Sequence, residues 1–137
     1  MNVETTELRA EQQTKTLHRR EQRMVRAYAD YLAGHGRTAV RRKIAVGDGR
    51  GYLFCDLFEE ERRNLVEAKA ATDRASIRMA IGQLADYARF CGDGIHKAVL
   101  LPTPPASDLA ALLSDQGIHA VWETPDGFQD NVGGDFI

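Results

Sequence analysis

The chain has 137 residues and a mass of 15.2 kDa, the size of one ordinary domain, and 43% of its residues are apolar. No stretch approaches the roughly 18 apolar residues of a membrane span. The N-terminus lacks the apolar core of a signal peptide. Two cysteines are too few for a disulfide framework or a structural zinc site. We therefore expect a single cytoplasmic domain over residues 1–137, without membrane contact, in which Cys55 and Cys91 are buried free thiols.

Charge is unevenly distributed along the chain. The formal net charge is −2, which argues against a protein that binds nucleic acid through bulk charge alone. Arginines nevertheless cluster over residues 19–26 and 37–42. We interpret the first cluster as a solvated helix face rather than a stripe that contacts nucleic acid.

The first half of the chain predicts a helix followed by three strands. Apolar residues at spacings of three and four predict a helix over residues 5–34, whose polar part within residues 1–14 is expected to fray. Alternating side chains predict a strand over residues 37–46, and an apolar and aromatic run predicts another over 51–58. The glycines at 47–49 predict the turn between them, and residues 65–70 predict a third strand. Short connections favour an antiparallel meander.

The second half alternates helices and strands. We expect a helix over residues 74–91, a buried central strand over 97–102, a short helix from 107 to 116, a strand over 119–123 and a loop over 124–137. The order α-β-β-β-α-β-α-β predicts an α/β protein with a mixed sheet flanked by helices.

Charged side chains stand on two of these otherwise apolar strands. Asp56 lies on the second strand, and Glu67 and Lys69 lie on the third. A short hairpin brings Asp56 beside Glu67, and a spacing of two residues places Glu67 and Lys69 on one sheet face. Unpaired charges there would cost several kcal/mol, so mutual pairing or a metal must compensate.

Metal-assisted phosphodiester hydrolysis uses this set of groups. The carboxylates of Asp56 and Glu67, with the backbone carbonyl of Ala68, are the hard oxygen ligands that Mg²⁺ prefers. The ammonium group of Lys69 would orient a water molecule and offset negative charge in the transition state. The simpler alternative is that Glu67 and Lys69 form a solvated pair on an edge strand.

Two helix residues extend the predicted site. Glu21 falls within the apolar stripe of the first helix and therefore faces the sheet. Gln83 shares a face of the second helix with Tyr87. A structural pairing of Glu21 with Arg42 or Lys43, and a plain surface role for Gln83, remain open alternatives.

The run Asp56…Glu67-Ala68-Lys69, followed by Gln83 and Tyr87, resembles the PD-(D/E)xK nuclease superfamily. The resemblance covers residues 15–123 and implies the restriction-endonuclease-like fold, whose core order is α-β-β-β-α-β. It implies that Asp56 and Glu67 are metal ligands, that Lys69 is the catalytic lysine, and that Glu21 and Gln83 support them. Cys55 stands where the motif name has proline.

The resemblance implies a Mg²⁺-dependent DNA endonuclease in which Mn²⁺ can substitute. We expect a role in prokaryotic defence or restriction, with a junction-resolving or repair nuclease as the alternative. A third reading is an inactive binding module of the same fold. RNA ranks low as a substrate because no motif of exposed stacking aromatics is evident. The protein is expected to act as a homodimer or as a subunit of a larger assembly. Candidate substrate contacts are Arg42, Lys43, Arg74, Arg78 and Tyr87.

Overall fold

The computed structural model describes residues 3–47, 49 and 51–137. Asp48 of the predicted turn and residues 1–2 of the segment expected to fray lie outside the described residues. The helices are α1 (Val3–Gly34), α2 (Arg74–Ala88) and α3 (Ser107–Asp115). The strands are β1 (Val40–Val46), β2 (Gly51–Glu59), β3 (Asn64–Ala68), β4 (His96–Leu101), β5 (Ile118–Thr124) and β6 (Gly127–Asp130).

The described strands form one mixed six-stranded sheet in the order β1-β2-β3-β4-β5-β6. β1, β2 and β3 pair antiparallel, which confirms the predicted meander. β4 pairs parallel to β3 and to β5, so the predicted buried central strand is confirmed as well. Helical crossovers are needed to join parallel neighbours, and α2 and α3 supply them.

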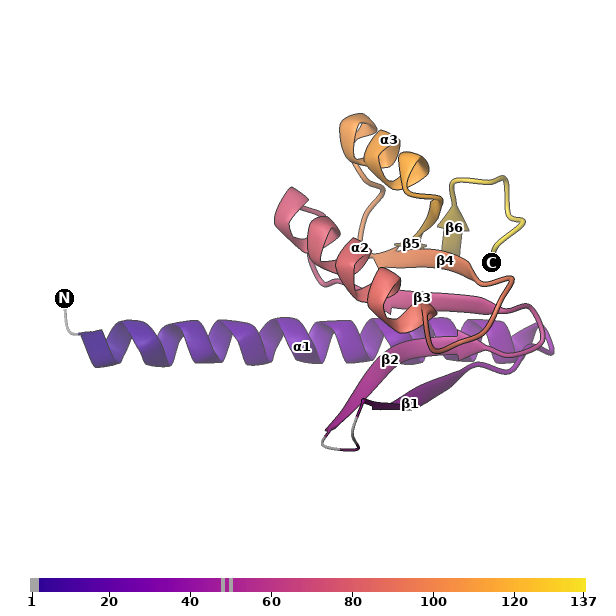
Figure 1. The fold of residues 1–137 in the computed structure, drawn as a ribbon. Coiled ribbons are helices and arrows are strands. Elements are labelled where there is room, and N and C mark those ends of the chain that lie inside the picture. The colour runs from indigo at the N-terminus through magenta and orange to yellow at the C-terminus, as the bar shows by residue number, and fades with distance from the viewer. Residues whose placement is uncertain (1–2, 48, 50) are drawn as a thin grey trace.

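Helices cover both faces of the sheet (Figure 1). On one face α1 packs Met24, Tyr28 and Leu32 against apolar side chains of β2, β3, β4 and β5. On the other face α2 and α3 enclose a second core that includes Ile77 and Leu84. Each helix buries one apolar stripe, as the spacing of its apolar residues predicts. The chain is therefore an α/β protein with a mixed sheet flanked by helices.

The N-terminal part of α1 leaves the body of the protein. Residues 4–20 are exposed throughout, and Figure 1 shows this part of the helix extending past the sheet. The side chains of this part of α1 are mostly polar. No described helix is long and apolar enough to cross a membrane.

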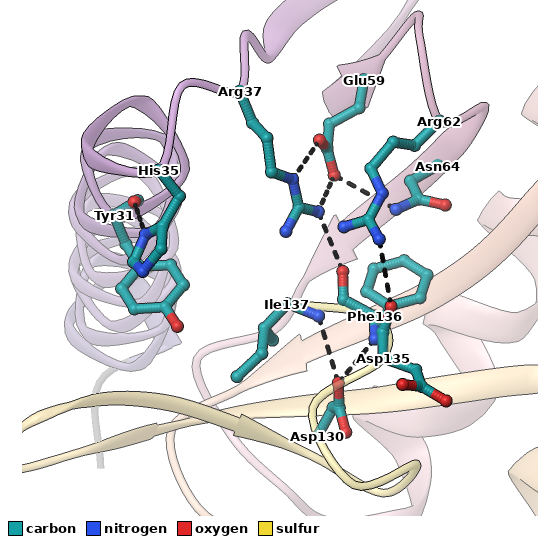
Figure 2. A network of polar contacts seen from close by, with 10 residues as sticks. All are labelled: Tyr31, His35, Arg37, Glu59, Arg62, Asn64, Asp130, Asp135, Phe136 and Ile137. Atoms are coloured by element: carbon teal, nitrogen blue, oxygen red, sulfur yellow. Dashed lines mark hydrogen bonds and ion pairs between the residues drawn. The ribbon is translucent and has the colours of Figure 1, made fainter.

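The prediction of a loop over residues 124–137 is wrong in part, because this segment contains a strand. Residues 127–130 form β6, which pairs antiparallel with β5. The sequence Gly-Phe-Gln-Asp has no apolar alternation that would predict a strand. The Asp130 carboxylate explains the order of the rest, because it accepts hydrogen bonds from four backbone N–H groups of residues 132, 134, 136 and 137 at 2.8–3.1 Å. Figure 2 shows the bonds from Phe136 and Ile137. The backbone of this segment is therefore tied to the sheet.

An ion pair fastens the same segment to the closed end of the β2–β3 hairpin. Arg37 donates to both carboxylate oxygens of Glu59 at 2.8 and 2.6 Å, and also to the Phe136 carbonyl at 2.9 Å (Figure 2). Asn64 donates to Glu59 at 3.1 Å. Glu59 is thus a buried carboxylate with its oxygens satisfied.

Candidate active site

The strands β2 and β3 separate at the end opposite their turn. Their pairing runs from Glu59↔Asn64 to Leu57↔Val66, and the next opposed positions in this register are Asp56 and Glu67. Instead of continuing the ladder, the Asp56 side chain accepts a hydrogen bond from the Ala68 N–H at 2.8 Å. The Asp56 carboxylate therefore takes the place of a main-chain acceptor of β2. Its second oxygen can contact another group.

A β-bulge on β2 aims this carboxylate. Between the pairs Val40↔Phe58 and Arg42↔Cys55, β1 advances by two residues and β2 by three. The extra residue falls at Asp56–Leu57, opposite Arg41. A bulge turns successive side chains to the same side and is frequent beside active sites. Asp56 and Leu57 accordingly both line a groove between α1 and the β1–β2 hairpin.

Glu67 is the most perturbed carboxyl group of the site. It is 4% exposed, and its Oε2 atom is buried without a hydrogen-bond partner among the described residues. Burial, followed by the charge of Asp56 and a hydrogen bond with that carboxyl, raises the pKa of Glu67 to about 9. At neutral pH Glu67 therefore keeps its proton, unless a cation takes its place.

Lys69 follows β3 directly and is only 6% exposed. Its backbone N–H donates to the Leu100 carbonyl at 2.9 Å, which fixes the main chain beyond the end of the strand. Its positive charge lowers the pKa of Glu67 and opposes the larger effects of burial and Asp56. β3 is a central strand and both side chains are buried, so the alternative of a solvated pair on an edge strand is wrong.

The two predicted helix residues also reach this end of β3. Glu21 of α1 accepts a hydrogen bond from the Ala70 N–H at 3.3 Å, and its charge contributes to the raised pKa of Glu67. Gln83 of α2 has a buried Oε1 atom without a hydrogen-bond partner in the described part of the chain. The pKa of the buried Tyr87 is raised mainly by burial and next by the charge of Glu67, whereas a hydrogen bond from Gln83 lowers it. Four of the five predicted site residues, Asp56, Glu67, Lys69 and Glu21, interact at this end of β3, and Gln83 is connected to them through Tyr87.

The donor set fits a divalent cation with hard ligands. Asp56 offers one carboxylate oxygen beyond its bond to Ala68, and Glu67 offers an unpartnered one. A cation between them would remove the repulsion that holds the proton on Glu67. Among the described residues no group of three or more His, Cys, Asp and Glu side chains converges. The fit therefore rests on two carboxylates, with backbone oxygen and water completing the shell.

The predicted substrate contacts divide into two groups. Lys43 is exposed on the β1–β2 hairpin, and Arg78 is exposed on the first turns of α2. Arg74 forms an ion pair with Asp108. Arg42 and Tyr87, by contrast, face the core on the α2 side.

Arg42 is held away from Asp56 by two contacts. Its guanidinium carbon lies 4.9 Å from the centroid of the Phe58 ring, and its Nη1 atom lies 3.7 Å from a carboxylate oxygen of Glu60. The alternation along β1 places Arg42 on the same face as the buried Ile44. Since Lys43 lies over the Tyr52 ring, neither cation provides the structural partner of Glu21 that was the alternative for that residue.

The groove contains residues that sequence reasoning did not select. It has a volume of about 400 Å³ and is lined on the α1 side by His18, Gln22 and Arg26, and on the strand side by Arg41 and Asp56. Arg26 and Arg41 belong to the two arginine clusters that are evident in the sequence. The sequence alone does not say which members of a cluster face a groove.

The two thiols take no part in this chemistry. Cys55 and Cys91 are buried and free, as predicted. Burial raises the pKa of Cys55 to about 11 and that of Cys91 above its ordinary value, so neither is an activated nucleophile.

No family model matches the chain, and neither the curated proteins nor the solved structures contain a match to it.

Proposed function

We propose that the protein is a Mg²⁺-dependent endonuclease that hydrolyses phosphodiester bonds in DNA. One observation carries the proposal: the half-buried Asp56 and the buried Glu67 are held together at the open end of β2 and β3 beside the buried Lys69. Such an arrangement is unfavourable for the folded protein by itself. It becomes favourable when a cation and a phosphate enter.

Each residue of the proposed site has a separate role. Asp56, Glu67 and the Ala68 carbonyl hold Mg²⁺, or Mn²⁺ in its place. A bound ion would supply Lewis-acid chemistry, polarising a phosphoryl oxygen and lowering the pKa of water at the site. Lys69 orients the attacking water and offsets the negative charge of the transition state.

Glu21 and Gln83 are positioning residues. Glu21 fixes the main chain just beyond Lys69 through its bond to the Ala70 N–H. Gln83 presents a buried amide oxygen that can receive a hydrogen bond from a site water. Both act on the geometry of the site from opposite faces of the sheet.

The resemblance described above extends the proposal to a role in prokaryotic defence. The proposal includes a homodimer or a larger assembly in which each chain supplies one such site. The buried free thiols are compatible with the reducing cytoplasm.

A cleavage assay with a matched lysine control tests the proposal. Supercoiled plasmid, linear duplex, single strand, four-way junction and RNA are each incubated with protein in Mg²⁺, Mn²⁺ or EDTA. We expect metal-dependent cleavage that falls at least about a hundredfold in Lys69→Ala. Lys97→Ala is the control, because Lys97 pairs with Leu65 near the opposite end of the sheet. Equal cleavage by both variants, or cleavage that persists in EDTA, would contradict the proposed mechanism.

A further inference from the structure

We infer that the substrate is single-stranded where it enters the site, and that its bases stack on Tyr52 and Phe54 of the β1–β2 hairpin. This inference rests on the proposed nuclease function, because it names the class of nucleic acid on which that same site acts.

The hairpin has one buried face and one open face. Ile44, Val46, Leu53 and Cys55 belong to the core on the α2 side of the sheet. Because side chains alternate along a strand, their neighbours point to the opposite side. These neighbours are the cations Arg41 and Lys43 of β1 and the aromatic residues Tyr52 and Phe54 of β2.

The two aromatic rings are exposed to solvent. Tyr52 is 55% exposed and Phe54 is 42% exposed. The Lys43 Nζ atom lies 3.8 Å from the centroid of the Tyr52 ring, and the Arg41 guanidinium carbon lies 4.4 Å from that of Phe54. Exposed rings that alternate with cations are typical of surfaces that bind single strands, because bases stack on rings while cations contact phosphates.

This face continues directly into the candidate active site. Tyr52, Phe54 and Asp56 occupy alternate positions of β2, so they lie in one row. At a rise of about 3.4 Å per residue, Phe54 is roughly 7 Å from Asp56 along the strand, and Tyr52 is roughly 14 Å from it. Arg26 faces the same groove from α1. A strand bound along the row would therefore bring a backbone phosphate to the carboxylates.

The alternatives fit this face less well. In a duplex the base faces are stacked on one another inside the helix and are not available to side chains. A second copy of the hairpin would bring Arg41 and Lys43 against the same two cations, which repel one another. A single strand offers both free base faces and negative charge.

Equilibrium binding tests the inference separately from cleavage. The full chain is titrated against a fluorescent dT20 oligonucleotide by anisotropy in Ca²⁺ and again in EDTA. An abasic 20-mer, a 20-bp duplex and U20 serve as comparison ligands. The variants are Tyr52→Leu and Phe54→Leu, with Phe90→Leu as control. Phe90 is a partly exposed ring beside Arg89 that follows the end of α2, away from the hairpin. Thermal melting confirms that each variant is folded.

We expect dT20 to bind more tightly than the abasic strand and the duplex. Each hairpin substitution should lower the affinity for dT20 roughly fivefold to a hundredfold, while Phe90→Leu leaves it unchanged. A preference for U20 over dT20 would support stacking and assign the strand as RNA, and the reverse preference would assign it as DNA. Equal binding of dT20 and the abasic strand, tighter binding of the duplex, or self-association lost in Phe54→Leu would overturn the inference. If binding follows the expected pattern but no substrate is cleaved, the proposed nuclease function fails and the single-strand surface stands.

Discussion

Two buried glutamates on neighbouring strands should respond in opposite ways to the same substitution. Glu59 and Glu67 are 2% and 4% exposed. Glu59 is satisfied by Arg37 and Asn64 (Figure 2), whereas Glu67 faces Asp56 and has an unpartnered oxygen. Glu67→Gln should therefore stabilise the metal-free protein, while Glu59→Gln should destabilise it.

The magnitude for Glu67 follows from its pKa. The unfolded chain releases the proton near the ordinary value of 4.5, and the folded protein retains it to about 9. The contribution of Glu67 to the free energy of unfolding is complete below pH 4.5 and is lost as the pH rises toward 9. The loss is about 1.36 kcal/mol per pH unit, or roughly 3 kcal/mol at pH 7. A neutral amide avoids this loss and can donate to Asp56.

Urea denaturation in EDTA at pH 5, 7 and 8 measures the difference. Glu67→Gln should exceed the wild type by less than about 1 kcal/mol at pH 5 and by roughly 3 kcal/mol at pH 7. Glu59→Gln should lose about 1.5–3 kcal/mol at pH 7, because it weakens charged hydrogen bonds to Arg37. If Glu67→Gln is destabilised like Glu59→Gln, Glu67 is a stabilising paired carboxylate and the reasoning is refuted.

Three further predictions concern separate parts of the molecule. Millimolar Mg²⁺ should raise the melting temperature of the wild type more than that of Asp56→Asn, and equal shifts would place the cation elsewhere. Tyr28→Phe should raise the free energy of unfolding by about 1 kcal/mol, because the Tyr28 hydroxyl is buried without a hydrogen-bond partner in the described residues; a loss in urea denaturation would reveal a partner. Asp130→Asn should lower it by about 1–3 kcal/mol and speed amide exchange at Phe136, whose N–H the carboxylate holds; unchanged exchange would contradict that anchoring role.

The parts of the fold that follow local patterns could be predicted from the sequence. The alternation and short turns of the first three strands predicted the meander, and a spacing of two residues placed Glu67 and Lys69 together. Glu21 was found because a carboxylate interrupts an apolar helical stripe. These signals are local, since they depend on residues within one element or one hairpin.

The remaining features depend on contacts between distant segments. The bulge at Asp56 arises from the register between β1 and β2, which no local pattern specifies. Strand β6 has a polar sequence and forms because its neighbours supply hydrogen-bond partners. The aromatic residues Tyr52 and Phe54 suggest core positions by composition, yet both are exposed on the face of the hairpin opposite the core.

Cleavage by the wild type and by Glu67→Gln, compared in Mg²⁺ at pH 7, tests most directly whether Asp56, Glu67 and Lys69 form a hydrolytic site. Glu67→Gln is the decisive variant because it should be more stable than the metal-free wild type, so lost activity cannot be attributed to unfolding. We expect the wild type to cut nucleic acid and Glu67→Gln to cut at least about a hundredfold more slowly. Full activity in the stabilised variant, or no cleavage of any substrate by the wild type, would contradict a metal-dependent nuclease at this site.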